Sequence, residues 1–441
     1  MELDLRNIQS ASLKKKSVQD VLKELDYVAE EAADARDMDL VRDPELRKAL
    51  NIVEEFLRDT HRICYGGMAI NAHLPKDQKF YDFNKTLPDY DFFTPEPARD
   101  IKDLVKRLKS AGFSDVSDRE GMHEGTKKIF VNYTGVADIT TIPYWMYNVL
   151  LKRSVKDDGI QFADADFLRM NMYLELSRPR GEVERWDKVY KRLVLLNIAK
   201  KPATYHCDKK KTDLTRIGHD LYRKLIDYIC EKELIFTGAE LQRIYSTPEQ
   251  KSARFILKSQ SPIVAFAQTP EHHLPVLRQI LHTMDSNSKI DVVQWKSRGD
   301  FVPELYGIKN NGKLVVLLVT QNACNAYNTV ELSGGKKLRI AALDTAITLY
   351  YTLTFVRGMD GIVPKSVHCF ADSLVDISMH TRDRGEGGIF PLFVESCEGH
   401  QPSKASLIKA KVERVRAMKT RKSSSKKRSS GKRYSTKRRH N

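Results

Sequence analysis

The sequence lacks the cysteine pattern of a zinc site or of a disulfide framework. Its six cysteines are scattered over 441 residues, and no two of them stand in a CxxC spacing. In a chain of this length, such usage is typical of free thiols in a reducing compartment. The neighbours His206-Cys207 and His368-Cys369 are interpreted as coincidence rather than as a metal site.

Long apolar segments are missing as well. The longest aliphatic run, Leu314 to Val319, is far shorter than the roughly 20 residues that a membrane span needs. Residues 1–10, MELDLRNIQS, have no basic start followed by an apolar core, as a signal peptide would. We therefore expect a cytoplasmic protein with no membrane partner.

Acidic residues are nearly absent from residues 401–441. This stretch holds 16 Lys/Arg and one acid, Glu413, so it carries +15 of the chain's net charge of +16. Because it is rich in Ser, Lys and Arg, we predict that 401–441 is a disordered basic tail. Such a tail would bind RNA backbone phosphates, and we assign this contact to Lys427 and Arg428. A nuclear address or a solubility role are the alternatives.

The rest of the chain contains two mixed α/β stretches set among helices. The apolar periodicity predicts an α+β fold in which each stretch forms a mixed sheet flanked by helices. The expected boundaries are an N-terminal helical segment (1–44), a first mixed domain (45–200), a helical connector (201–260) and a second mixed domain (261–400).

Three aspartates mark the first mixed domain. In LPDYDFF, a predicted strand, Asp89 and Asp91 point the same way, roughly 6.5–7 Å apart. Asp138 lies in GVADITTIP, part of a predicted hairpin, and pairing of the two strands would bring three carboxylates within a few ångströms. Such carboxylates repel one another unless a cation lies between them, and Mg²⁺ prefers hard oxygen ligands. The cluster could hold two ions suited to phosphoryl transfer.

A glycine pair precedes these aspartates. Gly66-Gly67 follows a short apolar run and opens a predicted helix. Backbone N–H groups at such a turn form an anion nest, and glycine lets phosphate approach closely. Taken alone, the D-x-D pair could be a solvated acidic strand and the glycines a plain turn; their combination favours a nucleotide site.

A dense set of basic residues follows the predicted site, in RPRGEVERWDKVYKRL. Helical spacing places Arg185, Lys188 and Arg192 on one face. We assign Lys188 and Arg185 to nucleotide phosphates, with a solvated helix face as the alternative. For RNA contact we name Arg178, Arg180, Lys191 and Arg192. We expect Trp186 to pack in the core rather than to stack on a base.

These motifs resemble the signature of the DNA polymerase β-like nucleotidyltransferase superfamily, which joins a Gly-Gly turn, Asp-x-Asp and a third carboxylate. The stretches YGGMAIN, LPDYDFF, VADITTIP and YLELSRPRGEVERWDKVYKRLVLLN resemble the poly(A) polymerase catalytic subunits of large DNA viruses, of the poxvirus and giant-virus kind. Two features depart from the pattern. The spacer before Asp89 is long, which suggests an inserted loop at residues 76–86, and Met68 replaces the serine common in this turn.

The resemblance implies that Asp89, Asp91 and Asp138 are catalytic and bind two Mg²⁺ or Mn²⁺ ions. It implies ATP as substrate, an RNA 3′ end as acceptor, and Asp138 as a ligand that helps to deprotonate the attacking hydroxyl. It further implies a second, degenerate nucleotidyltransferase-like domain without catalysis, a homodimer or a processivity subunit as partner, and a site of action in the viral factory or virion. The glycines in SGGKKL (333–338) are expected to form a hairpin turn rather than a phosphate loop.

The leading functional hypothesis is therefore a polynucleotide adenylyltransferase that adds AMP to RNA 3′ ends. Two alternatives stay open: another RNA terminal nucleotidyltransferase, such as a CCA-adding or uridylyl enzyme, and a non-catalytic RNA-binding protein. The three intact carboxylates argue against the last of these.

Overall fold

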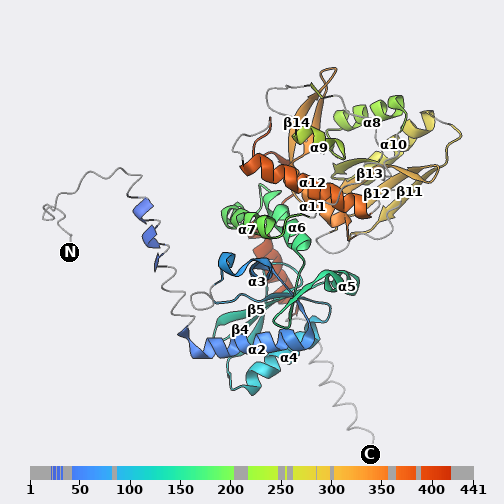
Figure 1. The fold of residues 1–441 in the computed structure, drawn as a ribbon. Coiled ribbons are helices and arrows are strands. Elements are labelled where there is room, and N and C mark those ends of the chain that lie inside the picture. The colour runs from blue at the N-terminus through green and yellow to red at the C-terminus, as the bar shows by residue number, and fades with distance from the viewer. Residues whose placement is uncertain are drawn as a thin grey trace, which may run out of the picture.

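Two mixed α/β units, joined by a layer of helices, make up the protein in the computed structural model (Figure 1). The structure describes residues 21–32 in part, 42–81, 87–202, 217–246, 254–255, 262–284, 286–297, 302–355, 364–383 and 389–418. Of the helices within these ranges, none has the length and apolar character that a bilayer crossing requires.

The first unit is built on a seven-stranded sheet of order β3-β4-β5-β2-β1-β7-β6. Its strands are β1 (Ile63–Tyr65), β2 (Asp91–Thr94), β3 (Val116–Glu120), β4 (Thr126–Val131), β5 (Thr134–Thr141), β6 (Val155–Asp157) and β7 (Ile160–Phe162). The helices α2 (Pro44–Thr60), α3 (Gly66–His73), α4 (Pro97–Ser110) and α5 (Tyr144–Arg153) pack around it, and α6 (Ala165–Leu176) and α7 (Trp186–Ala199) follow.

Local sequence explains the start of this unit. The Asp43 side chain caps α2 by accepting from the backbone N–H groups of Glu45 and Leu46. The helix buries an apolar stripe that includes Val53, Phe56 and Leu57 against the sheet. The predicted hairpin forms between β4 and β5, and its turn lies at Asn132 and Tyr133, which both have positive φ.

The second unit contains a nine-stranded sheet, in which β9 pairs beside the path β11-β12-β13-β10-β8-β15-β14-β16. Its strands are β8 (Ile235–Thr237), β9 (Arg254–Phe255), β10 (Ile263–Ala267), β11 (Ile290–Trp295), β12 (Leu305–Asn310), β13 (Lys313–Thr320), β14 (Asn325–Leu332), β15 (Lys337–Ala341) and β16 (Cys397–Glu398). Its helices are α8 (His219–Glu231), α9 (Glu240–Tyr245), α10 (Pro270–Met284), α11 (Leu343–Leu353) and α12 (Pro364–Asp383). The α+β expectation of two mixed sheets flanked by helices is confirmed, and Gly334 and Gly335 form the predicted turn between β14 and β15.

Two segments differ from the predicted boundaries. Strand β8 lies between β10 and β15, so the stretch expected to be a helical connector contributes a central strand to the second sheet. Its three residues are all buried, and so short a strand has no periodicity that sequence analysis could detect. Residues 404–418 are helical, although we predicted disorder from residue 401. Within this helix, Arg414 donates to the Met122 carbonyl oxygen of the first unit at 2.9 Å. Lys427 and Arg428 lie outside the described residues.

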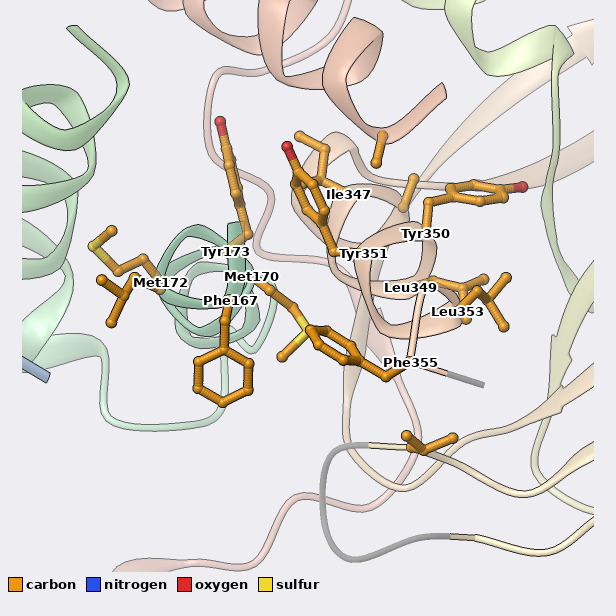
Figure 2. Packing of buried hydrophobic residues seen from close by; sticks show 14 of the residues in the cluster. Phe167, Met170, Met172, Tyr173, Ile347, Leu349, Tyr350, Tyr351, Leu353 and Phe355 are labelled. Carbon is orange, nitrogen blue, oxygen red and sulfur yellow. The ribbon is translucent and has the colours of Figure 1, made fainter. Parts of the chain in front are cut away.

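Helix α6 of the first unit packs against α11 of the second (Figure 2). The rings of Phe167 and Phe355 meet edge to face, with centroids 5.9 Å apart. Thr352 donates to the Met170 sulfur at 3.3 Å. Because this contact surface is apolar and buried, the two units share one continuous hydrophobic core.

The free-thiol prediction is wrong for Cys324 and Cys397, which form a disulfide. Strand β16 pairs with the start of β14 and so brings together two cysteines that are 73 residues apart in the sequence. Cys369 is also disulfide-bonded. Cys64 and Cys230 are free thiols, as predicted.

Candidate active site

Asp91 and Asp138 are direct neighbours in the first sheet. Strand β2 runs parallel to β5, and the register pairs Asp91 with Asp138. Burial raises the pKa of Asp91 to about 8, with further contributions from the negative charges of Asp89 and then Asp138. Burial also raises the pKa of Asp138. The pairing expected from the sequence is present, and it creates a strong local demand for positive charge.

Asp89 does not lie on a continuous strand with Asp91, as we had predicted. Strand β2 begins at Asp91, and the Asp91 N–H donates to the Asp89 carbonyl oxygen at 3.3 Å across a tight turn. The Asp89 side chain is exposed, and the side-chain oxygens of the three aspartates do not all lie within 4.8 Å of one another. The triad is therefore wider than predicted, although Asp89 still acts electrostatically on both other carboxylates.

Lys128 is a member of this site that sequence reasoning missed. It stands opposite Asp138 in the antiparallel pairing of β4 with β5, and its ammonium group contacts the Asp138 carboxylate. This contact opposes the rise in the pKa of Asp138. The hairpin register could have identified Lys128, but only if the turn had been placed correctly at Asn132 and Tyr133.

The glycine turn touches the carboxylates directly. Gly66 has φ +70°, and a Cβ built on it would lie 2.6 Å from Asp91 Oδ2. Gly67 is buried at the start of α3, and a Cβ there would lie 2.6 Å from Tyr81 Oη and 3.0 Å from Arg192 Nη1. Glycine is thus required at this turn both for its backbone conformation and for close approach. The turn and Asp91 form one site.

Arg185 and Lys188, the two residues assigned to nucleotide phosphates, interact electrostatically with the aspartates. The positive charge of Arg185 opposes the rise in the pKa of Asp91. Burial lowers the pKa of Lys188, as do its neighbours Arg192 and Arg185, while Asp89 opposes this shift. Arg185 also pairs with Glu182 at 3.0 Å. Arg185, at the N-terminal cap of α7, and Lys188, within α7, therefore bring positive charge up to the carboxylates.

The remaining assigned residues lie in different settings. Lys191 is exposed and pairs with Asp187 on the same helix at 2.8 Å, and Arg180 is exposed. Arg178 is half-buried beside Gly181. Trp186 packs against the hydrophobic core and its Nε1 donates to the Glu175 carbonyl oxygen at 3.1 Å, in agreement with the predicted packing role.

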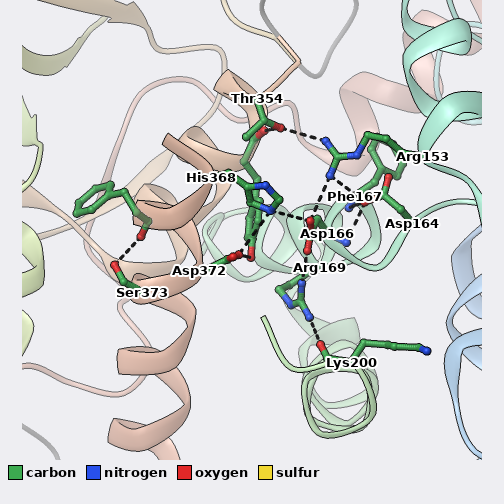
Figure 3. A network of polar contacts seen from close by, with 12 residues as sticks. Arg153, Asp164, Asp166, Phe167, Arg169, Lys200, Thr354, His368, Asp372 and Ser373 are labelled. Carbon is green, nitrogen blue, oxygen red and sulfur yellow. Dashed lines mark hydrogen bonds and ion pairs between the residues drawn. The ribbon is translucent and has the colours of Figure 1, made fainter. Parts of the chain in front are cut away.

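A second polar cluster connects the two units (Figure 3). His368 of α12 contacts the Asp166 carboxylate of α6 at 2.8 Å, and Asp372 lies 3.7 Å from the same His368 nitrogen. Within the described parts of the chain, these three residues alone bring three potential metal ligands within 4.8 Å of one another. Arg153 and Arg169 also pair with Asp166, so the cluster already contains its own positive charge.

Comparisons with known proteins find similarity in sequence and in fold. Residues 51–182 match the family model described as poly(A) polymerase catalytic subunit. A protein of Acanthamoeba polyphaga mimivirus that carries this subunit name is 32% identical over 157 residues, which are 34% of this chain and 26% of that protein. A protein of the same name from African swine fever virus (strain Badajoz 1971 Vero-adapted) is 28% identical over 145 residues, 32% of this chain and 30% of that protein. The matched region thus spans less than a third of each relative's length.

The crystal structure of the Megavirus polyadenylate synthase superposes on the chain with a TM-score of 0.70. The match covers 94% of this chain and 86% of that one, at 19% sequence identity. The shared fold therefore extends well beyond the segment that the family model matches. The resemblance predicted from the sequence is confirmed: residues 51–182, which carry Gly66-Gly67 and all three aspartates, are similar to the poly(A) polymerase catalytic subunit family.

Proposed function

We propose that this protein is a polynucleotide adenylyltransferase that transfers AMP from ATP to the 3′ end of RNA. The observation that carries the proposal is the contact between the Gly66 turn and Asp91, which is itself paired with Asp138. A phosphate-accepting turn and a carboxylate pair thereby form one site, within the segment that matches the family.

The side chains present fit a hard divalent cation. Asp91 has a pKa raised to about 8 because it is buried beside two other carboxylates, and Lys128 lies against Asp138 as a positive charge. Asp89, Asp91 and Asp138 would hold Mg²⁺ or Mn²⁺, for which carboxylate oxygens are suitable ligands. When bound, two such ions would stabilise the charge on the attacking and leaving oxygens of the transferring group.

The residues of the chain would then position the reactants. A bond forms between the RNA 3′ oxygen and the α-phosphorus of ATP. The bond between that phosphorus and the oxygen it shares with the β-phosphorus breaks, so pyrophosphate leaves. Asp138, which lies beside Asp91 in the sheet, would also help to take up the proton of the 3′ hydroxyl. Lys188 and Arg185 would balance charge on the phosphates.

The proposal extends to partners and location. The basic residues of α7 and the 401–441 segment supply positive charge for an RNA backbone, which supports RNA as the acceptor. A homodimer or a second subunit is proposed because the relatives are named as catalytic subunits. Because these relatives belong to large DNA viruses, we propose that the protein acts in the cytoplasm of an infected cell.

A primer-extension assay tests the proposal. The full chain is incubated with a short RNA oligonucleotide, Mg²⁺ or Mn²⁺, and each NTP separately. We expect long products only in the mixture that contains ATP. Extension in the mixtures with UTP or CTP would favour another terminal nucleotidyltransferase. RNA binding without extension in any mixture would contradict both enzymatic hypotheses.

A double substitution tests the site itself. Asp89→Asn/Asp91→Asn should abolish extension and preserve RNA binding. Glu55→Gln, at an exposed position on α2, removes a carboxylate elsewhere and should extend RNA normally. Extension by the double variant would disprove the role assigned to the carboxylates.

A further inference from the structure

Residues 76–81 fold back onto the glycine turn. They belong to the loop that makes the spacer before Asp89 longer than in the nucleotidyltransferase signature. This segment forms a short 3₁₀ turn at Lys76–Gln78 and then places Tyr81 beside α3. The Tyr81 N–H donates at 3.2 Å to the side-chain oxygen of Asn71, a buried residue of α3. Because α3 begins at the glycine pair, this bond fixes Tyr81 relative to Gly67.

The same segment holds the side chain of Arg192 from α7. The Arg192 guanidinium lies 4.7 Å from the centroid of the Phe80 ring and 5.8 Å from that of Tyr81. Its Nη2 donates to Tyr81 Oη at 3.3 Å. Aromatic faces attract a guanidinium and restrict its orientation. Phe80 and Tyr81 therefore act as a shelf that directs Arg192 toward Gly67.

Among the described residues, no carboxylate lies within ion-pair distance of Arg192. The positive charge of Arg192 opposes the rise in the pKa of Glu175, but that carboxylate pairs with Arg185 at 3.5 Å instead. The nearby cation Lys188 has its pKa lowered partly by Arg192, so the two positive charges lie close together. Gly67 lies against Arg192, whereas the adjacent Gly66 lies against Asp91. The Asp91 carboxylate and the Arg192 guanidinium thus lie on either side of the glycine pair. A polyphosphate with a bound metal ion could use both groups, because the carboxylate would hold the ion and the guanidinium would contact phosphate oxygens.

We propose that Arg192 binds the polyphosphate of the incoming nucleotide and that Phe80 and Tyr81 are positioning residues for it. This inference rests on the proposed function, and it changes the sequence-based assignment of Arg192 to RNA. The planar guanidinium suits bidentate contact with phosphate oxygens. Since Arg192 donates to Tyr81 Oη, the tyrosine O–H can itself donate to a phosphate. The inserted segment would thereby perform part of the task that a serine side chain performs in other nucleotidyltransferases.

Kinetics with ATP as the varied substrate test the role of Arg192. Arg192→Gln should raise KM for ATP by about 10- to 100-fold, the usual worth of a hydrogen bond to a charged group, and change RNA affinity little. Arg192→Lys should recover part of the loss, because it restores charge but not the planar fork. Lys102→Gln, which removes an exposed charge on α4, is the matched control and should leave KM unchanged.

The shelf is tested by substitutions that keep or remove the aromatic face. Phe80→Leu should raise KM for ATP several-fold at nearly constant kcat, and Phe80→Trp should restore it, because a ring is the feature required. Tyr81→Phe keeps the ring and should have the smaller effect. A loss in Phe80→Leu that Phe80→Trp fails to restore would disprove the shelf.

Calorimetric binding of inorganic tripolyphosphate with Mg²⁺ separates this inference from the proposed function, because it needs no RNA extension. Weaker binding by the Arg192→Gln variant than by the wild type supports the inference even if the wild type extends no primer. Equal binding by the two proteins, or a rise in the RNA KM with an unchanged ATP KM, would overturn it.

Discussion

Replacing Gly66 with alanine perturbs the candidate site at its most crowded point. The backbone there has φ +70°, and the added Cβ would lie 2.6 Å from Asp91 Oδ2. Real Cβ atoms essentially never lie within 3.0 Å of a non-bonded atom. The short, half-buried Asp91 side chain must therefore move, and its carboxylate is a proposed metal ligand.

The magnitude follows from two separate effects. Alanine in the left-handed region costs about 1 kcal/mol of folding stability, because its Cβ crowds the following carbonyl oxygen. The Asp91 carboxylate must withdraw by about 0.8 Å, because ordinary contact begins at 3.4 Å and the built Cβ lies at 2.6 Å. Misplacement of a reacting group by about 1 Å can lower the rate about 100-fold. We expect kcat/KM to fall by roughly 30- to 100-fold, which is about 2–2.7 kcal/mol of transition-state stabilisation.

Gly112→Ala is the matched control. Gly112 has φ +101° and no atom within 4 Å of a Cβ built on it, so it reproduces the backbone strain without the contact. Urea denaturation should show a similar loss of stability in both variants, and kcat/KM for primer extension should fall only in Gly66→Ala. Equal activity in the two variants would refute the argument that Gly66 is required by its closeness to Asp91.

The remaining predictions concern stability. Contact with Asp166 raises the pKa of His368 in the folded protein. This contact therefore stabilises the fold fully below about pH 6.5, which is the pKa of histidine in the unfolded chain. The stabilisation is lost as pH rises through the pKa of His368 in the folded state. The melting temperature of His368→Gln should therefore lie furthest below that of the wild type in acid, and a difference that grows toward alkaline pH would contradict this sign. Serine at Cys324 and Cys397 should cost about 2–5 kcal/mol of stability in urea unfolding, with primer extension retained below the transition. Loss of activity without loss of stability would instead give the disulfide a role in the site.

The family resemblance and much of the site could be predicted from sequence because the signals are local. Gly66-Gly67 and the D-x-D pair fall within one short stretch, and alternation along β5 set Asp138 apart from its apolar neighbours. Short-range rules of backbone conformation and strand periodicity suffice for such features. The predicted position of Asp89 was wrong, because a tight turn just before β2 interrupts the alternation of side chains along the strand.

What the sequence by itself determined, then, is the chemical inventory: three carboxylates, a glycine turn, and a concentration of cations on one helix face. Only the tertiary structure decided how these groups meet. Arg192 reaches Gly67 across more than a hundred residues, and Cys324 meets Cys397 because β16 pairs with β14. Contacts of this kind depend on the packing of distant elements, and no periodicity along the chain records which distant element a side chain will meet.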